Sequence, residues 1–316
     1  MSRELRIVFM GTPNFAVGVL KEIIEAGKNV VAVITAPDRP AGRGRKLMAS
    51  AVKEYAQSKN LHVMQPTNLK DESFIDELKS LDANLQVVVA FRMLPKVVWQ
   101  IPEYGTFNLH ASLLPQYRGA APINWAIING EAKTGVTTFF IDEKIDTGDI
   151  IANKEVSIDK DENAETLHDK LKQKGSELVL ETLELIENDQ AKPKSQINSD
   201  TLKDAPKLTP ENTRIDWTLN GKEIENFIRG LSPYPVAWSI LKNNDEELKM
   251  KIYAGTFEES EHDLTVGKVH ATKKELKIAC SGGFIEVKEL QLPGKRKMDV
   301  ISLLNGFSFS EDSELL

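Results

Sequence analysis

Short apolar runs and longer amphipathic segments alternate along the first half of the chain. Strands buried on both faces are expected in the apolar runs at residues 5–10, 29–35, 62–66, 85–91 and 106–110. Helical periodicity lies between them, over residues 15–27, 48–60 and 72–81. Strands that alternate with helices of this length predict an α/β fold built on a doubly wound, mostly parallel sheet.

The pattern changes in the second half of the chain. Strand-like segments at residues 135–142 and 148–158 precede a long predicted helix at 162–188. Residues 189–210 then lose periodicity and fill with Lys, Pro, Ser, Asn and Asp, as an interdomain linker does. Beyond a helix at 221–231, five alternating strand candidates and a helix near 298–306 predict a small OB-like β-barrel. The predicted boundaries are a first domain at 1–189, a linker at 190–207 and a second domain at 208–316.

Composition narrows the class of protein. Cys280 is the only cysteine among 316 residues, which excludes an internal disulfide or a cysteine-rich zinc site and suits a reducing cytoplasm. We expect this thiol to be inert packing. No metal is expected, because the histidines outside residues 106–110 (His62, His168, His262 and His270) have no metal-ligand spacing. No association with a membrane is expected either, because no apolar run has the length of a membrane helix.

Charge is spread unevenly along the chain. The formal net charge of −7 argues against a protein that coats nucleic acid without specificity. Residues 38–46 and 293–297 are nevertheless strongly basic. The first of these segments is too rich in Gly and Pro for regular structure and too basic for a simple turn, although a solvated loop remains an alternative.

The first glycine turn does not suit a dinucleotide. Pro13 stands where a G-x-G-x-x-G motif needs its second glycine, and proline has no N–H to offer a pyrophosphate. No Walker A sequence occurs in the chain. Nucleotide-dependent redox or kinase chemistry is therefore not expected.

Polar groups gather where a predicted strand ends. Asn108 and His110 are two residues apart in the run at 106–110, so both face one side of the strand, and Asp146 lies in a glycine-bounded loop. If they converge, an amide, an imidazole and a carboxylate can stabilise an oxyanion and move a proton without a covalent nucleophile. The alternative is structural: such a pair can cap a sheet edge, and such an aspartate can cap a loop. A serine hydrolase using Ser112 would need a G-x-S-x-G elbow, which is absent.

Several longer motifs are recognisable together. FNLHASLLPQYRGAAPINWAI and the later IDTGDI resemble the 10-formyltetrahydrofolate-dependent formyltransferase superfamily. Within it, GTPNFAV, TAPDRPAGRGRKLMASAVK, IRGLSPYPVAW and LQLPGKRKM are similar to the methionyl-tRNA formyltransferase family. The resemblance implies a Rossmann-like catalytic domain joined to an OB-like domain. It also implies transfer of the formyl group of 10-formyltetrahydrofolate to the α-amine of initiator methionyl-tRNA.

The same resemblance assigns roles to individual residues. The catalytic positions are Asn108, His110 and Asp146. The folate-contacting positions are Ser112, Leu113, Leu114 and Pro115, with Phe91, Met93 and Leu94 at the pterin pocket. The positions that contact tRNA are Arg39, Arg43, Arg45 and Lys46 in the first basic segment, Arg43 foremost, and Lys295, Arg296 and Lys297 in the second.

Two other functions stay open from the sequence. A formyltransferase that acts on a sugar-nucleotide amine shares the core motif, although the basic segments favour tRNA. A nucleic-acid-binding module without catalysis would leave Asn108, His110 and Asp146 without a role. We expect a monomer because nothing in the chain marks an interface. Arg118 is expected to brace a loop, with positioning of a ligand as the alternative. Trp125 and Ile127 are expected to belong to the core rather than to form a stacking platform.

Overall fold

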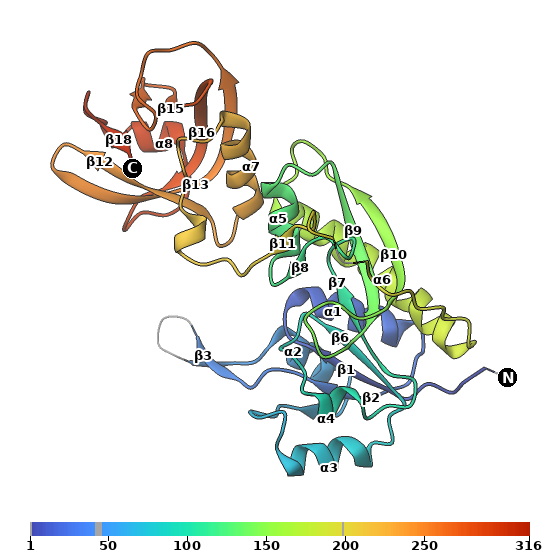
Figure 1. Cartoon of the computed structure of the whole chain (residues 1–316). Helices are drawn as coiled ribbons and strands as arrows, with labels where there is room; N and C mark the ends of the chain where they lie inside the picture. The colour runs from blue at the N-terminus through green and yellow to red at the C-terminus, as the bar shows by residue number, and fades with distance from the viewer. Residues whose placement is uncertain (1, 42–45, 198) are drawn as a thin grey trace. The chain divides into compact units, whose positions relative to one another are not determined.

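The computed structural model describes residues 2–41, 46–197 and 199–316 (Figure 1). The chain forms two compact units, neither of them contiguous in sequence. The first comprises residues up to 119, 134–157 and 168–204, and the second comprises 120–133, 158–167 and 205–316. The boundaries predicted above follow sequence order and stay a prediction.

The first unit is built mainly around a seven-stranded sheet. Its elements are β1 (Ile7–Gly11), α1 (Asn14–Glu25), β2 (Val30–Ile34), β3 (Arg39–Ala41), β4 (Lys46–Met48), α2 (Ala51–Ser58), β5 (Val63–Met64), α3 (Glu72–Ser80), β6 (Leu85–Val89), α4 (Lys96–Trp99), β7 (Thr106–His110), β8 (Arg118–Gly119), β9 (Lys133–Phe140), β10 (Ile150–Ser157) and α6 (Ala164–Glu187). The first residue of β9 and the first turn of α6 are assigned to the second unit. The sheet order is β10-β9-β7-β6-β1-β2-β5. The pairs β1–β2, β1–β6, β2–β5 and β6–β7 are parallel and β7–β9 is antiparallel, as a mostly parallel sheet requires.

The side of the sheet that carries the polar groups follows from register. Val88 of β6 lies opposite Asn108 of β7, so the two side chains share a face. Val88 belongs to a buried apolar cluster with residues of α3 and α4, among them Phe74 and Val98. Asn108 and His110 therefore emerge on the face that α3 and α4 help to cover, at the carboxyl end of β7.

The prediction of no regular structure in the first basic segment was wrong for the residues that the structure describes. Antiparallel strands β3 and β4 pair Arg39 with Met48. The two strands pair through backbone hydrogen bonds, which do not depend on the type of side chain. Residues outside the hairpin hold its base in place. Asp38 accepts hydrogen bonds from Gln65 and Lys53, at 2.8 and 2.6 Å, and the pKa of its carboxyl is lowered chiefly by the bond from Gln65 and then by that from Lys53. Arg43 and Arg45 lie outside the described residues.

The second unit holds a nearly closed antiparallel barrel, as the alternating pattern predicted. Its elements are α5 (Pro122–Ile128), β11 (Asp204–Ala205), η1 (Glu211–Thr213), α7 (Gly221–Leu231), β12 (Ala237–Asn243), β13 (Glu246–Glu259), β14 (Val269–Ala271), β15 (Leu276–Cys280), β16 (Gly283–Gln291), β17 (Met298–Asp299), α8 (Val300–Leu304) and β18 (Glu314–Leu315), with β11 starting at the boundary. The order is β14-β15-β16-β13-β12-β18, and a bridge between Lys268 and Glu314 brings the two ends together.

Helices α5 and α7 pack inside this unit. Asn220 caps α7 through its side chain, which accepts from the N–H of Glu223, and Glu223 returns a bond to the backbone of Asn220. The Asn124 amide of α5 donates to the Gly230 carbonyl at 2.8 Å. Ile127 is fully buried, as predicted. Trp125 is only half-buried, because its indole N–H reaches the Pro206 carbonyl.

In the part of the chain that the structure describes, no helix is both long enough and apolar enough to cross a membrane.

Candidate active site

His110 is the buried centre of the polar cluster at the end of β7. Its Nε2 lies 2.8 Å from the Tyr117 carbonyl, which can only accept, so Nε2 carries a hydrogen. Its Nδ1 lies 3.6 Å from Oδ2 of Asp146, beyond hydrogen-bond distance but within ion-pair range. With Nε2 committed as a donor, Nδ1 carries a hydrogen only when the ring is an imidazolium. The Asp146 carboxylate is the acidic group that faces Nδ1.

The Asn108 amide is available to a ligand. The side chain is half-buried and comes from the same side of β7 as His110. Among the residues that the structure describes, none forms a hydrogen bond with this amide. Both of its N–H groups therefore remain able to donate to a ligand.

Asp146 lies in the loop between β9 and β10, where the local sequence holds the chain in a tight turn. Asp142 accepts from the Lys144 N–H at 2.9 Å and from the Thr147 hydroxyl at 2.8 Å. A Cβ at Gly148 would lie 1.7 Å from the Phe140 carbonyl oxygen, so only glycine fits there. The Asp146 carboxylate itself accepts from the Gly119 N–H at 2.9 Å. The loop thus presents one oxygen of Asp146 toward β7 and His110.

The turn after β7 is fixed by its own hydrogen bonds. The Ser112 hydroxyl donates to the Gln116 carbonyl at 2.6 Å, and the Thr137 hydroxyl donates to the Ser112 carbonyl at 2.7 Å. Ser112 and Leu114 are buried, whereas Leu113 and Pro115 are half-exposed. The Ser112 oxygen is thus committed within the turn, which does not favour the alternative of a serine nucleophile.

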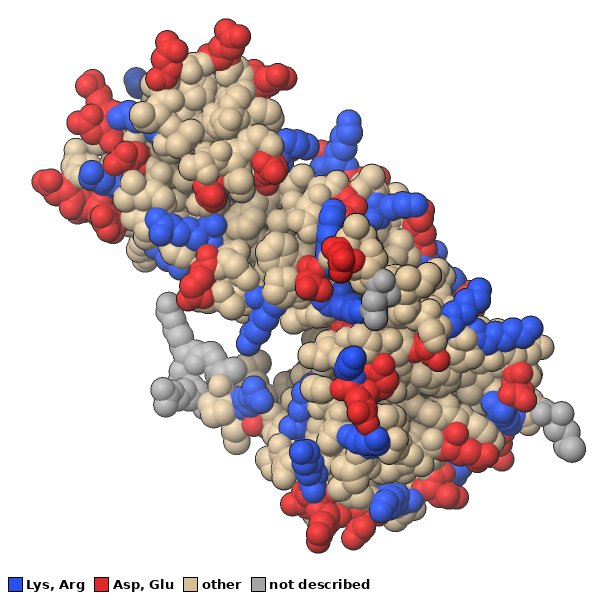
Figure 2. All heavy atoms as spheres, viewed as in Figure 1, with Lys and Arg blue, Asp and Glu red and all other residues tan. Residues whose placement is uncertain are grey.

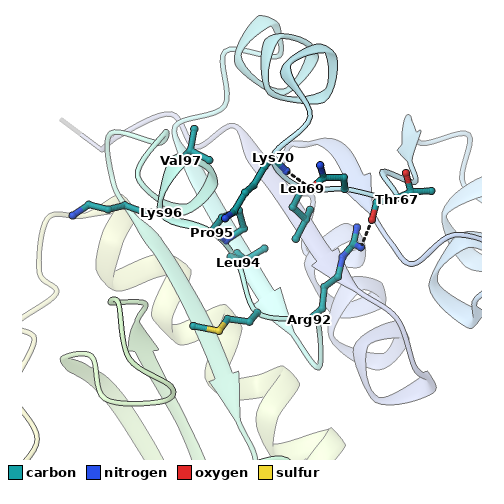
Figure 3. A pocket seen from close by; sticks show the side chains of 10 residues that line it. Thr67, Leu69, Lys70, Arg92, Leu94, Pro95, Lys96 and Val97 are labelled. Atoms are coloured by element: carbon teal, nitrogen blue, oxygen red, sulfur yellow. Dashed lines mark hydrogen bonds between the residues drawn. The ribbon is translucent and has the colours of Figure 1, made fainter.

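A pocket of about 670 Å³ lies next to the loop that follows β6 (Figure 3). Its lining includes Met93, which is 67% exposed, and Leu94, which is buried. Phe91 is half-buried beside Arg92, whose guanidinium lies 5.6 Å from the Phe91 ring centre. Two of the three predicted pterin-pocket residues, Met93 and Leu94, therefore line one cavity.

Arg92 is a lining residue of this pocket that the sequence analysis missed. It donates to the Thr67 carbonyl at 3.0 Å, while its buried Nε has no hydrogen-bond partner in the described structure. Burial, with a smaller contribution from Arg39, lowers the pKa of the guanidinium. Because this nitrogen is covered by protein, it lies out of a ligand's direct reach in this conformation. The only available sign in the sequence was an arginine inside an otherwise apolar run.

The predicted tRNA-contacting residues of the second basic segment lie on the surface of the barrel unit. Lys295, Arg296 and Lys297 are all exposed. Lys297 pairs with Glu289 at 2.6 Å and lies 5.0 Å from the Tyr253 ring centre. Figure 2 shows Lys and Arg scattered among Asp and Glu over the face in view.

Arg39, in the first basic segment, is exposed on β3, and Lys46 begins β4. Arg118 braces a loop, as predicted, because Nε and Nη2 both donate to the Gln196 side-chain oxygen. Gln196 itself lies in the stretch interpreted as a linker, and nothing in its sequence context marked it.

No group of three metal-ligating side chains occurs among the residues whose placement is described.

Comparison with known families adds a match over most of the chain. Residues 5–183 match the family model described as formyl transferase, and residues 207–308 match the one described as formyl transferase, C-terminal domain. A protein of Flavobacterium johnsoniae named methionyl-tRNA formyltransferase is 60% identical over 99% of both chains. The methionyl-tRNA formyltransferase of Bacteroides thetaiotaomicron is 52% identical over 98% of this chain and 97% of its own.

Solved structures share the fold at lower identity. A sugar 3N-formyl transferase, WlaRD, solved in the presence of dTDP and 5-N-formyl-THF, has a TM-score of 0.65 and 22% identity, and the match covers 93% of this chain and all of that one. HypX from Aquifex aeolicus in complex with tetrahydrofolic acid has a TM-score of 0.64 and 20% identity, over 96% of this chain and 47% of that one. At these identities the likeness extends to the fold alone.

Proposed function

The chain belongs to the formyl transferase family, and from this premise we propose that it transfers the formyl group of 10-formyltetrahydrofolate to the α-amine of initiator methionyl-tRNA. The relatives that carry the name methionyl-tRNA formyltransferase align over nearly the whole chain, which supports this substrate over a sugar nucleotide. One geometric observation supports this chemistry most directly. Oδ2 of Asp146 lies 3.6 Å from Nδ1 of His110, and His110 shares strand β7 with Asn108, whose amide makes no hydrogen bond among the described residues.

The first step is attack of the free α-amine on the formyl carbon, which forms a carbon–nitrogen bond and leaves negative charge on the former carbonyl oxygen. Asn108 donates one N–H to that oxygen. Because Nε2 of His110 is held by the Tyr117 carbonyl, the second donor is Nδ1–H of the imidazolium. Asp146 stabilises the imidazolium and orients it toward the substrate.

The second step breaks the bond between the formyl carbon and N10 of the folate. The attacking amine loses one proton, and N10 gains one as tetrahydrofolate leaves. Asp146 is the basic group nearest to His110 in the cluster, so we assign it the relay of this proton through water. No covalent enzyme intermediate is needed, in agreement with the committed hydroxyl of Ser112.

The pocket beside Arg92 supports a folate site. Met93 and Leu94 supply apolar lining and Arg92 adds a charged residue to the same lining, a combination that suits a flat heterocycle with polar edges. We propose that Phe91, Met93 and Leu94 contact the pterin. The turn at Ser112, Leu113, Leu114 and Pro115 then contributes backbone and apolar surface rather than the serine hydroxyl.

The tRNA is proposed to meet the two basic segments through its phosphates. Arg39, Arg43, Arg45 and Lys46 supply one set of charges, and Lys295, Arg296 and Lys297 the other. The proposal assigns chemistry and the first set of tRNA contacts to the domain at 1–189, and the second set of tRNA contacts to the domain at 208–316. We also propose that the protein acts in the cytoplasm and is a monomer. Light scattering of the purified protein tests the monomeric state.

One assay tests the function directly. The protein is incubated with radiolabelled 10-formyltetrahydrofolate and methionyl-tRNA, and in parallel with a sugar nucleotide that bears a free amine. We expect label only on the aminoacyl-tRNA. Label on the sugar would replace the substrate assignment, and tRNA binding without transfer to either acceptor would identify a non-catalytic binding protein.

A further inference from the structure

The loop that carries Asp146 is held in a conformation that needs support. Asp146 has a φ of 54°, in the left-handed region that residues with a side chain seldom adopt. Its carboxylate is tied to the Gly119 N–H at 2.9 Å, so any rotation of its backbone would pull that oxygen away. The groups that hold the Asp146 backbone therefore determine how far the carboxylate lies from His110.

The Gln196 side chain holds this backbone from a distant part of the sequence. Its Nε2 donates to the Asp146 carbonyl at 3.0 Å and to the Gly148 carbonyl at 2.8 Å. Its Oε1 accepts from Nε and Nη2 of Arg118, at 3.1 and 2.6 Å. Carbonyls can only accept and a guanidinium can only donate, so the orientation of the Gln196 amide is fixed by its partners. All four of its hydrogen-bonding positions are used.

These bonds close a ring around Asp146. Arg118 directly precedes Gly119, whose N–H holds the Asp146 carboxylate. Gln196 links Arg118 to the Asp146 carbonyl. The carboxylate and the carbonyl of one residue are thus fixed to two consecutive residues of β8, one directly and one through Gln196. A substitution at Gln196 opens this ring without removing the carboxylate.

The segment that carries Gln196 is itself anchored. Lys194 pairs with Ile150 through two backbone hydrogen bonds, at 2.8 and 2.9 Å. The Ser195 hydroxyl donates to the Asp149 carboxylate at 2.8 Å. Gln196 therefore reaches the loop from a fixed strand-like stretch, although the sequence alone suggested an unstructured linker.

We propose that Gln196 is a positioning residue, which holds the Asp146 carboxylate beside the His110 imidazole. This inference rests on the proposed function, because it assigns Gln196 a role in formyl transfer through Asp146. Gln196 contacts no reacting atom in this scheme. Its loss should lower the rate of the chemical step and leave the binding of both substrates unchanged.

The first test compares two substitutions in the full-length protein. Gln196→Met keeps the length of the side chain and removes every hydrogen bond, whereas Gln57→Met makes the same change at an exposed glutamine of α2. We expect Gln196→Met to lower kcat by about 10- to 100-fold, as a shift of a catalytic group by about 1 Å does. The KM values for folate and for methionyl-tRNA should stay within about twofold, and Gln57→Met should retain the original kcat.

A double substitution separates positioning from general damage. If Gln196 acts through Asp146, Gln196→Met should cost almost nothing further in an Asp146→Asn background, because residues that act as a unit are not additive. Urea unfolding of each variant reports whether the fold is intact. Should Gln196→Met be poorly folded, Gln196→Glu replaces it: this variant keeps the acceptor for Arg118 but faces two carbonyls with a carboxylate, and it should lower kcat likewise.

Failure of this inference differs from failure of the proposed function. If the unsubstituted protein forms no labelled formylmethionyl-tRNA, the function itself is wrong. If it does, and the folded Gln196 variants keep full kcat or multiply the loss caused by Asp146→Asn, Gln196 does not position Asp146.

Discussion

The two ring nitrogens of His110 have different surroundings, and the difference decides which one serves a substrate. Nε2 is held by a backbone carbonyl at 2.8 Å, and Nδ1 has only a carboxylate at 3.6 Å. A backbone carbonyl cannot change its hydrogen-bonding role, so the fold assigns Nε2 to anchoring. Donation from Nδ1 then requires the imidazolium, since the neutral ring has its one hydrogen on Nε2.

Asn108 offers the sharpest test at the level of one residue. We expect Asn108→Ala to lower kcat by about 10²- to 10³-fold, because it removes the donor that the proposed mechanism places on the developing oxyanion. The KM for each substrate should change much less than kcat, since the lost bond forms mainly in the transition state. Steady-state kinetics with both substrates varied measure this split.

Asn188→Ala is the matched control for that substitution. Asn188 is exposed just beyond the end of α6, and its amide donates to the Glu184 carbonyl. The same change of side chain there should leave kcat unaltered. An Asn108→Ala enzyme with near-normal kcat and intact folding would remove the oxyanion role from our scheme.

Whole elements were predictable where burial imposes a period on the sequence. The bounds of β7 and α7 agree with the predicted ranges 106–110 and 221–231, because each has one clear apolar pattern and a stop at its end. The β3–β4 hairpin, α4 and α5 were not foreseen. These elements are short, and their stability comes from anchors elsewhere in the chain, such as the bonds at Asp38.

The residues of the candidate site also divide into those that a local pattern predicts and those that depend on distant contacts. Asn108 and His110 could be found from strand periodicity, because their spacing on β7 places both on one side. Asp146 could be proposed from its glycine-bounded loop, but its assignment as catalytic came from the family resemblance, since a loop aspartate has many uses. Gln196 could not be found by either route: its role depends on a return of the chain to Ile150, which no local pattern encodes.

The buried thiol where β15 meets β16 should make the stability of the protein depend on pH. Cys280, at the end of β15, is fully buried, and its Sγ lies 3.4 Å from the Gly283 carbonyl. Burial raises the pKa of this thiol from 9.0 to about 11. A raised pKa in the folded state means that the thiol's contribution to stability is complete below pH 9 and is lost as the pH rises toward 11.

The measurement is urea unfolding between pH 8 and pH 11, for the original protein and for Cys280→Ala. The free energy of unfolding of the original should fall relative to the variant by about 1.4 kcal/mol per pH unit between the two pKa values. The variant carries a constant cavity cost but no titrating thiol, so it cancels the effects of other groups. A difference that does not change with pH would show that burial does not hold the thiol protonated.

At the scale of the whole molecule, a polyanion must bind a protein whose net charge is −7. Long-range attraction is therefore weak, and affinity must come from local contacts between cations and phosphates. Such contacts release counterions, so the logarithm of the binding constant falls linearly with the logarithm of the salt concentration. The slope counts the phosphates that the protein engages.

We expect the paired substitution of Lys295 and Arg296 by Ala to reduce this slope by about 1.4 to 1.8, which is about 0.7 to 0.9 for each lost phosphate contact. Filter binding of methionyl-tRNA across a salt series measures it, and the KM for folate should not change. The matched control replaces Lys273 and Lys274, which are exposed on the same unit and carry the same charge. If both pairs reduce the slope equally, only net charge matters, and the second basic segment does not contact the tRNA.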